Sequence, residues 1–175
     1  MSIIKTLALS KTLTKSLLAK SAIFASFLAI ATVIPALIHQ QFITGPIVNA
    51  ILFSSTIILG TESAIMIGLI PSLIALSFGL LSPALAPMVP FIMMSNALLV
   101  MIFSSLQKRN YWMSMIFASI LKFLFLFATS SIVINLLIKK EVATKVAQMM
   151  SWPQLITALM GGITAFLIIK AKKKD

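Results

Sequence analysis

The chain has 175 residues, of which 60% are hydrophobic and only 10% are charged. Soluble domains contain roughly 45–50% apolar and about 25% charged residues, so these values exclude an ordinary soluble domain. With no cysteine and a single histidine, the chain cannot form disulfides, thiolate metal sites or a histidine metal cluster. We therefore expect an integral membrane protein that needs no metal ion or other cofactor.

The N-terminal region combines lysines with apolar residues. Residues 1–20 carry four lysines between leucines and isoleucines. This pattern predicts a basic amphipathic segment that lies at the membrane surface. The apolar run Ser21–Ile38 follows, and its length approaches the roughly 20 residues that a transmembrane helix needs. It is the first predicted span.

Five more apolar runs, separated by short polar turns, predict five more transmembrane helices. They cover Pro46–Gly60, Ser63–Leu81, Pro83–Leu106, Tyr111–Ile138 and Ser151–Ile169. The predicted fold class is an all-α integral membrane protein, a compact bundle of six transmembrane helices within residues 21–170. A polar stretch, residues 139–150, is expected to connect the last two spans, and residues 171–175 form a basic tail.

The basic residues predict the orientation of this bundle. Six spans place both termini on one side of the membrane. The basic residues on that side are Lys5, Lys11, Lys15, Lys20, Lys108, Arg109, Lys170, Lys172, Lys173 and Lys174. The basic residues on the other side are Lys139, Lys140 and Lys145. The positive-inside rule therefore predicts cytoplasmic termini in the plasma membrane, and it explains the net charge of +11 without nucleic acid as a partner.

Four polar residues within the predicted spans, namely Asn49, Asn96, Lys122 and Asn135, are candidates either for a binding site or for contacts between helices. Lys122 lies near the middle of the fifth span, where a charged side chain costs roughly 3 kcal/mol on insertion scales. It is either a cation that binds an anionic group such as a carboxylate, or a structural residue bonded to protein groups or water. Asn49 and Asn96 form either hydrogen bonds between helices or contacts to a ligand.

Prolines interrupt two of the predicted spans. Pro83, Pro87 and Pro90 lack the N–H group, so several carbonyls at the start of the fourth span lose their helical partners. Pro71 is expected to break the third span in the same way. Unpaired backbone groups at membrane depth are tolerated where protein or a water-filled cavity satisfies them. We expect a cavity wall open to the outside, although ordinary proline kinks explain the pattern as well.

The acidic residues give no sign of an active site. Glu62 and Glu141 lie at opposite ends of the predicted bundle, about 30 Å apart, and cannot form an acid–base pair. The chain contains no phosphate-binding loop of the Gly-x-x-x-x-Gly-Lys type. We therefore expect no enzymatic activity and no catalytic residue.

These features together resemble the S components of energy-coupling-factor (ECF) transporters. The resemblance rests on six short spans, a basic start, "TGPIVNA" at the second span and "LSPALAPMVPFIMMSN" at the fourth. It rests also on small residues that repeat along one face of the first span, namely Ala22, Ala25, Ser26 and Ala29. The resemblance implies that this face docks on the transmembrane T component. Two cytoplasmic ATPases would drive that complex.

The resemblance also implies a function and a site. S components capture a vitamin or another small micronutrient from outside and deliver it inward. The substrate site is expected to contain Lys122, Asn96, Trp152, Gln154 and Asn49, and the lid over it His39, Gln40 and Gln41. The single buried lysine favours a small, anionic substrate.

Two alternatives remain at this point. Trp152 is equally expected as an anchor at the membrane interface. For the whole chain, the alternative is a non-transporting, rod-shape-determining scaffold of the MreD-like type. A scaffold of this kind has no ligand pocket, and it predicts that Lys122 is closely paired with protein atoms.

Overall fold

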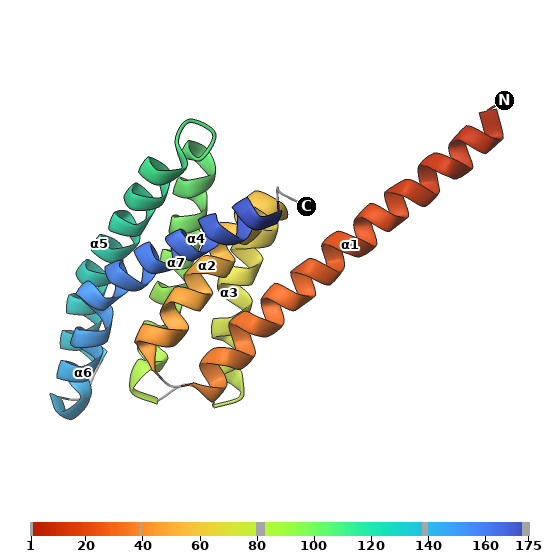
Figure 1. The fold of residues 1–175 in the computed structure, drawn as a ribbon. Helices are drawn as coiled ribbons and strands as arrows, with labels where there is room; N and C mark the ends of the chain where they lie inside the picture. Colours follow the sequence, from red (N-terminus) through yellow and green to blue (C-terminus); the bar gives the residue numbers. More distant parts are fainter. Residues whose placement is uncertain (1, 39, 80–82, 138–139, 173–175) are drawn as a thin grey trace.

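The fold is all-helical in the part of the chain that the structure describes (Figure 1). The computed structural model describes residues 2–38, 40–79, 83–137 and 140–172, and the side chains of residues 16–38, 40–79, 85–136 and 143–171. The helices are α1 (Ser2–Leu37), α2 (Gln41–Ile58), α3 (Thr61–Ser77), the 3₁₀ helix η1 (Pro83–Met88), α4 (Val89–Leu106), α5 (Tyr111–Leu137), α6 (Lys140–Met150) and α7 (Trp152–Lys172).

Most of these helices can cross a membrane. Five helical segments are long and apolar enough, namely Ser16–Leu37, Gln41–Ile58, Leu85–Leu106, Tyr111–Leu136 and Ala143–Ala171. With 17 residues α3 is shorter, and at 1.5 Å per residue it spans about 26 Å of a hydrocarbon core that is about 30 Å thick. Large apolar side chains point outward, among them Leu136, which is 74% exposed. The predicted class of an all-α, multi-pass membrane protein is confirmed.

The helices alternate in direction, so the connections gather at two ends of the bundle. The last residues of α1, α3 and α5 and the first residues of α2, η1 and α6 lie at the end away from both termini (Figure 1). We call this end the distal end. The opposite end, which we call the terminal end, holds both chain termini and the turns α2–α3 and α4–α5.

Helix α1 differs from the predicted layout. It continues without a break from Ser2 to Leu37, through the expected boundary between a surface segment at residues 1–20 and the first span. Its N-terminal part projects well beyond the other helices, and its distal part packs against α2 and α3 (Figure 1). The bundle is therefore compact over α2–α7, with α1 leaning away from it.

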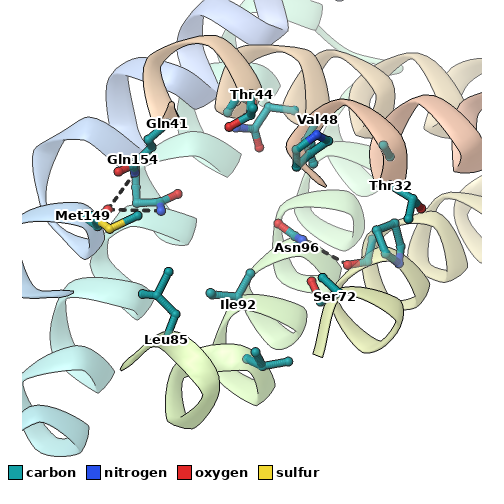
Figure 2. A pocket seen from close by; sticks show the side chains of 18 of the residues that line it. Thr32, Gln41, Thr44, Val48, Ser72, Leu85, Ile92, Asn96, Met149 and Gln154 are labelled. Atoms are coloured by element: carbon teal, nitrogen blue, oxygen red, sulfur yellow. Dashed lines mark hydrogen bonds between the residues drawn. The ribbon is translucent and has the colours of Figure 1, made fainter. Parts of the chain in front are cut away.

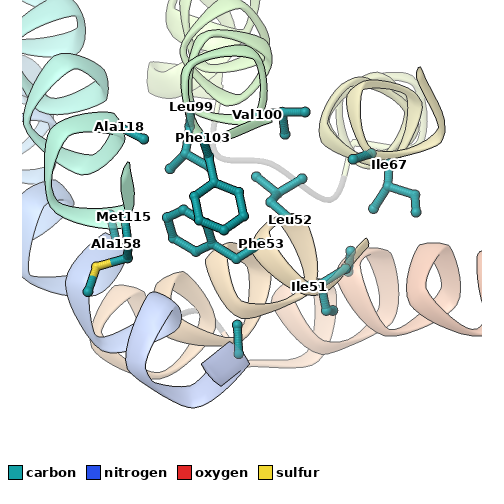
Figure 3. Packing of buried hydrophobic residues seen from close by; sticks show 13 residues of the cluster. Ile51, Leu52, Phe53, Ile67, Leu99, Val100, Phe103, Met115, Ala118 and Ala158 are labelled. Carbon is teal, nitrogen blue, oxygen red and sulfur yellow. The ribbon is translucent and has the colours of Figure 1, made fainter. Parts of the chain in front are cut away.

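The main hydrophobic core lies between α2, α3, α4, α5 and α7 and includes Ala31 of α1 (Figure 3). Phe53 and Phe103 form its centre, with ring centroids 4.7 Å apart in an edge-to-face arrangement that suits aromatic pairs. A smaller cluster, which includes Met88, Leu126 and Val146, joins η1, α5 and α6 toward the distal end. The space between these two clusters is where the cavity described below is found.

A glycine explains why α2 and α7 lie so close together. A Cβ atom added at Gly161 would stand 2.6 Å from the Cβ of Asn49 and 2.8 Å from both the Ala50 nitrogen and the Pro46 oxygen. Two of these contacts are backbone atoms, which cannot move without separating the helices. Gly161 therefore sets the distance of α7 from the part of α2 that carries Asn49.

One expectation about local structure was wrong, and one segment is more regular than the sequence analysis specified. The polar stretch does connect the last two spans, and Lys140–Met150 within it forms helix α6, because its apolar residues recur at helical spacing and cover one face. Pro71 does not break its span, since α3 continues through it to Ser77. By contrast, the segment with Pro83 and Pro87 does form a 3₁₀ helix before α4 begins.

Candidate functional site

A cavity of about 570 Å³ opens in the distal half of the bundle (Figure 2). Residues from α1 to α7 and η1 line it, so every helix takes part. Its walls are largely apolar, with the side chains of Ile67, Val89, Ile92, Val146, Met149 and Met150 among them. Ligand pockets usually measure roughly 300–1,000 Å³ and combine apolar walls with a few placed polar groups.

Lys122 stands at the inner wall of this cavity and is held by two asparagines. Its Nζ atom donates hydrogen bonds to Oδ1 of Asn49 and to Oδ1 of Asn96, each 2.7 Å long. The three side chains come from α5, α2 and α4 and are 4%, 2% and 5% exposed. They form what we call the lysine cluster, and all three line the cavity.

The two asparagines are fixed in the orientation that presents their oxygens to the lysine. Nδ2 of Asn49 donates to the Gly45 carbonyl at 2.9 Å, and Nδ2 of Asn96 donates to the Gly68 carbonyl at 3.0 Å. Because each amide nitrogen is engaged by a backbone carbonyl, each amide oxygen is left for the ammonium group. The lysine cluster thus ties α2, α3, α4 and α5 together.

The charge of Lys122 is not matched by an acid among the residues whose side chains the structure describes. Glu62 is the only acidic residue in that part of the chain, and it is exposed at the start of α3, at the terminal end. Both partners of the ammonium are neutral amides. A lysine carries three N–H donors, so one remains beyond these two bonds. The lysine cluster therefore presents a buried positive charge with spare donor capacity to the cavity.

A second polar group lies where α2, α6 and α7 meet. Nε2 of Gln41 donates to the Met149 carbonyl at 2.7 Å, and Nε2 of Gln154 donates to the same carbonyl at 3.2 Å (Figure 2). All three residues line the cavity. These bonds tie the end of α6 to the starts of α2 and α7, so the position of α6 over the cavity depends on them.

The lobe of the cavity between α1 and α3 offers hydrogen-bond acceptors. Pro35 and Pro71 lie within these helices and line the cavity. Each proline lacks the N–H group that would bond the carbonyl four residues earlier, which here belongs to Ala31 and to Ile67. The hydroxyl of Thr32 also lines this lobe and donates to its own helix, which leaves its lone pairs to accept a bond.

Most residues predicted for the site and lid lie at the cavity. Lys122, Asn49, Asn96, Gln154 and Gln41 all line it. The residues selected from the sequence therefore include all three polar residues of the inner wall and two of the three residues where α2, α6 and α7 meet.

Of the three other predicted residues, two do not line the cavity. Trp152 lies outside the lining and packs against Phe42, with ring centroids 5.9 Å apart and more than half of its surface exposed. Gln40 precedes α2 and is exposed. His39 lies outside the described residues.

The small residues predicted as a docking face form one continuous exposed surface. Ala22, Ala25, Ser26 and Ala29 are all exposed and follow one another along one side of α1. The Ser26 hydroxyl donates to the Ala22 carbonyl, so this polar group is satisfied within its own helix. The face is smooth and carries no unpaired polar side chain.

Sequence reasoning missed the contributions of α1 and α6 to the cavity, whereas Pro71 of α3, which was expected at a cavity wall, does line it. The α1 lining residues Ala31 and Ala36 are small and apolar, and nothing in their pattern distinguishes them from residues that face lipid. The contribution of α6 could have been found, because Val146, Met149 and Met150 recur at helical spacing within the polar stretch.

Comparison with protein-family models, with curated proteins and with solved structures finds no match to this chain. A proposal for its function therefore rests on the site itself.

Proposed function

We propose that this chain is the substrate-binding membrane subunit of an ECF-type ABC importer that captures a small, vitamin-like micronutrient. The observation that carries the proposal is the cavity of about 570 Å³ with the buried, acid-free Lys122 in its wall. A buried cation in a membrane protein is costly and usually marks a path or site for a ligand or ion. A cavity of this size lowers the stability of a fold, because the residues around it lose packing contacts. Stability alone therefore does not explain why the cavity is present.

The charge distribution supports the direction of uptake. The terminal end carries far more basic residues than the distal end, so the positive-inside rule directs both termini to the cytoplasm. The cavity lies in the distal half and then opens to the outside of the cell. A substrate would enter between α1, α3 and α6 and meet the lysine cluster near the middle of the membrane.

The exposed face on α1 supports a helical membrane partner. Small residues let the backbone of a second helix approach closely, and in lipid such packing is a main source of helix association. In the proposed complex this partner is the T component, which two cytoplasmic ATPases energise. The projecting N-terminal part of α1 extends the same helix beyond the bundle (Figure 1).

Purification from the native cell tests the proposal. The tagged chain, gently solubilised, should carry a second membrane subunit and two ATPase subunits, which native mass spectrometry identifies by mass. Replacing both Ala25 and Ala29 by leucine should remove these subunits because the added side chains block close helix packing. The matched control is Ala128→Leu, an exposed alanine on α5, which should leave the complex intact.

One observation favours the non-transporting scaffold as a second candidate. Lys122 is bonded to two protein side chains, as a scaffold with a structural lysine predicts. The same purification separates the two candidates. Cell-envelope morphogenesis proteins in place of a T component and ATPases would replace the transporter proposal by the scaffold.

A further inference from the structure

The lysine cluster and the cavity walls together narrow the class of substrate. The inference rests on the proposed function, because it concerns the molecule that the binding subunit would carry. Three properties of the cavity bear on the class of substrate, namely its charge, its unused hydrogen-bond donors and the chemistry of its walls.

The cavity contains one buried ionisable group, which carries a single positive charge when it is protonated. Lys122 and Lys145 are the only ionisable side chains among the lining residues that the structure describes. Lys145 lies exposed on α6, where water solvates its charge, whereas Lys122 is 4% exposed. One buried cation is neutralised by one anionic charge. A dianion would bring a second charge into a site of low dielectric, at a large desolvation cost.

The free donors of the lysine cluster fit a carboxylate. Lys122 retains a third N–H, and the amide nitrogens of Asn49 and Asn96 each carry a second N–H beyond the bond to a glycine carbonyl. A carboxylate has two oxygens that accept several hydrogen bonds, and bonds from an ammonium to it are about twice as strong as neutral ones. A neutral amide or an amine at this position would gain much less or be repelled.

The remaining walls fit an apolar body of limited size. Between the lysine cluster and the group at Gln41 and Gln154, the lining is supplied by aliphatic and methionine side chains of η1, α4 and α6. A volume of about 570 Å³ equals roughly 19 water molecules at about 30 Å³ each. A ligand of on the order of 20 non-hydrogen atoms therefore fills it.

We propose that the substrate is an amphipathic monocarboxylate of this size. Its carboxylate binds Lys122, Asn49 and Asn96 at the inner wall, and its apolar body lies between α4 and α6. The acceptors of the α1–α3 lobe, which include the Ala31 carbonyl, bind any hydroxyl or N–H group on that body.

Equilibrium dialysis with three matched probes tests this proposal. The full chain in nanodiscs is dialysed at neutral pH against radiolabelled 5-phenylpentanoate, the neutral 5-phenylpentanamide and the doubly charged (3-phenylpropyl)malonate, and empty nanodiscs correct for uptake by lipid. Wild-type protein should bind the carboxylate about tenfold or more tightly than the amide, since one charge-assisted bond is gained. The malonate, which adds a second carboxylate to the same body, should bind more weakly than the monocarboxylate.

Variants assign the preference to the lysine. Lys122→Gln should reduce carboxylate binding to the level of the amide, and Lys122→Arg, which keeps the charge, should retain the preference. The control Lys20→Gln removes an exposed lysine of α1 outside the cavity and should change nothing. Circular dichroism and gel filtration verify that each variant is folded. If Lys122→Gln fails to fold, the order of the three probes on wild-type protein still decides.

Several results would overturn the inference. These are equal or tighter binding of the amide, equal or tighter binding of the malonate, an unchanged preference in folded Lys122→Gln, and carboxylate binding no greater than to empty nanodiscs. Each of them leaves the importer proposal standing if the T component and ATPases co-purify. Conversely, if the chain prefers the carboxylate but the T component and ATPases do not co-purify with it, the proposed substrate class stands and the importer proposal is refuted.

Discussion

Replacing the whole lysine cluster by apolar residues should stabilise the ligand-free protein or leave its stability unchanged, while removing ligand binding. The triple variant is Lys122→Met with Asn49→Leu and Asn96→Leu. Methionine is nearly as long as lysine, and leucine branches at the same atom as asparagine. The variant therefore removes every polar atom of the lysine cluster and keeps its approximate shape.

The magnitudes follow from the two hydrogen bonds of Lys122. In the single variant Lys122→Met, two buried Oδ1 atoms lose their donor, at a cost of about 1–3 kcal/mol each. Removal of the buried charge raises the free energy of unfolding by roughly 3 kcal/mol. The converse pair, Asn49→Leu with Asn96→Leu, leaves the cation without a partner and should cost about 3–5 kcal/mol. The triple variant leaves neither an orphaned acceptor nor a charge, and comparable replacements elsewhere are neutral or stabilise by about 1–4 kcal/mol.

Reversible unfolding in mixed micelles measures this series. The free energies of unfolding are compared for wild type, Lys122→Met, the two asparagine replacements together, and the triple variant, all freed of ligand by dialysis. We expect the triple variant to be at least as stable as wild type, Lys122→Met to be intermediate, and the double asparagine variant to be the least stable. Binding of 5-phenylpentanoate is measured on the same samples and should be lost in the triple variant.

A triple variant that is clearly less stable than Lys122→Met would refute the reasoning. Such a result means that the lysine cluster contributes net stability, so the fold alone accounts for its presence. The cluster would then give no support to a ligand, and the scaffold proposal would gain accordingly.

Two further predictions concern the surroundings of the lysine cluster. Gly161→Ala should cost about 1–3 kcal/mol of unfolding free energy and weaken 5-phenylpentanoate binding, because the new methyl group displaces the backbone that carries Asn49; unchanged binding would show that the α2–α7 distance does not position this amide. Gln41→Ala should speed amide hydrogen exchange in α6 by about fivefold, since the loss of its bond to the Met149 carbonyl costs about 1 kcal/mol. The exposed Gln148→Ala is the control on α6, and equal rates in both variants would contradict this role for Gln41.

The sequence predicted the helical class and the principal polar residues because hydrocarbon constrains both strongly. In lipid an apolar run of sufficient length forms a helix, because its backbone N–H and C=O groups must form their hydrogen bonds within the segment. The same environment makes each intramembrane polar residue conspicuous. Lys122, Asn49 and Asn96 could therefore be selected from the order of amino acids alone, and they lie together at the cavity. Asn135 was selected on the same ground, but it is exposed and does not line the cavity.

The parts that could not be predicted depend on packing between helices. Gly161 is one of several glycines in apolar surroundings, and only the approach of α2 shows why a side chain cannot be placed there. Nothing in the sequence shows whether Trp152 lines a cavity or packs against a neighbour such as Phe42. The continuity of α1 from Ser2 to Leu37 was not predicted either, because a change from lysine-rich to apolar sequence near residue 20 does not indicate whether a helix continues through it.

The arrangement around Lys122 also bears on the ambiguity that the sequence left open. A lysine kept only for structure gains most from a carboxylate partner, or from partners that use all three of its donors. Here two neutral amides hold it in place, their own nitrogens are fixed by backbone carbonyls, and one donor is left over on a residue that lines the cavity. Such a site is preorganised, because the cost of holding the charge and its partners has already been met by folding. An anion that enters then gains a charge-assisted hydrogen bond without reordering the helices.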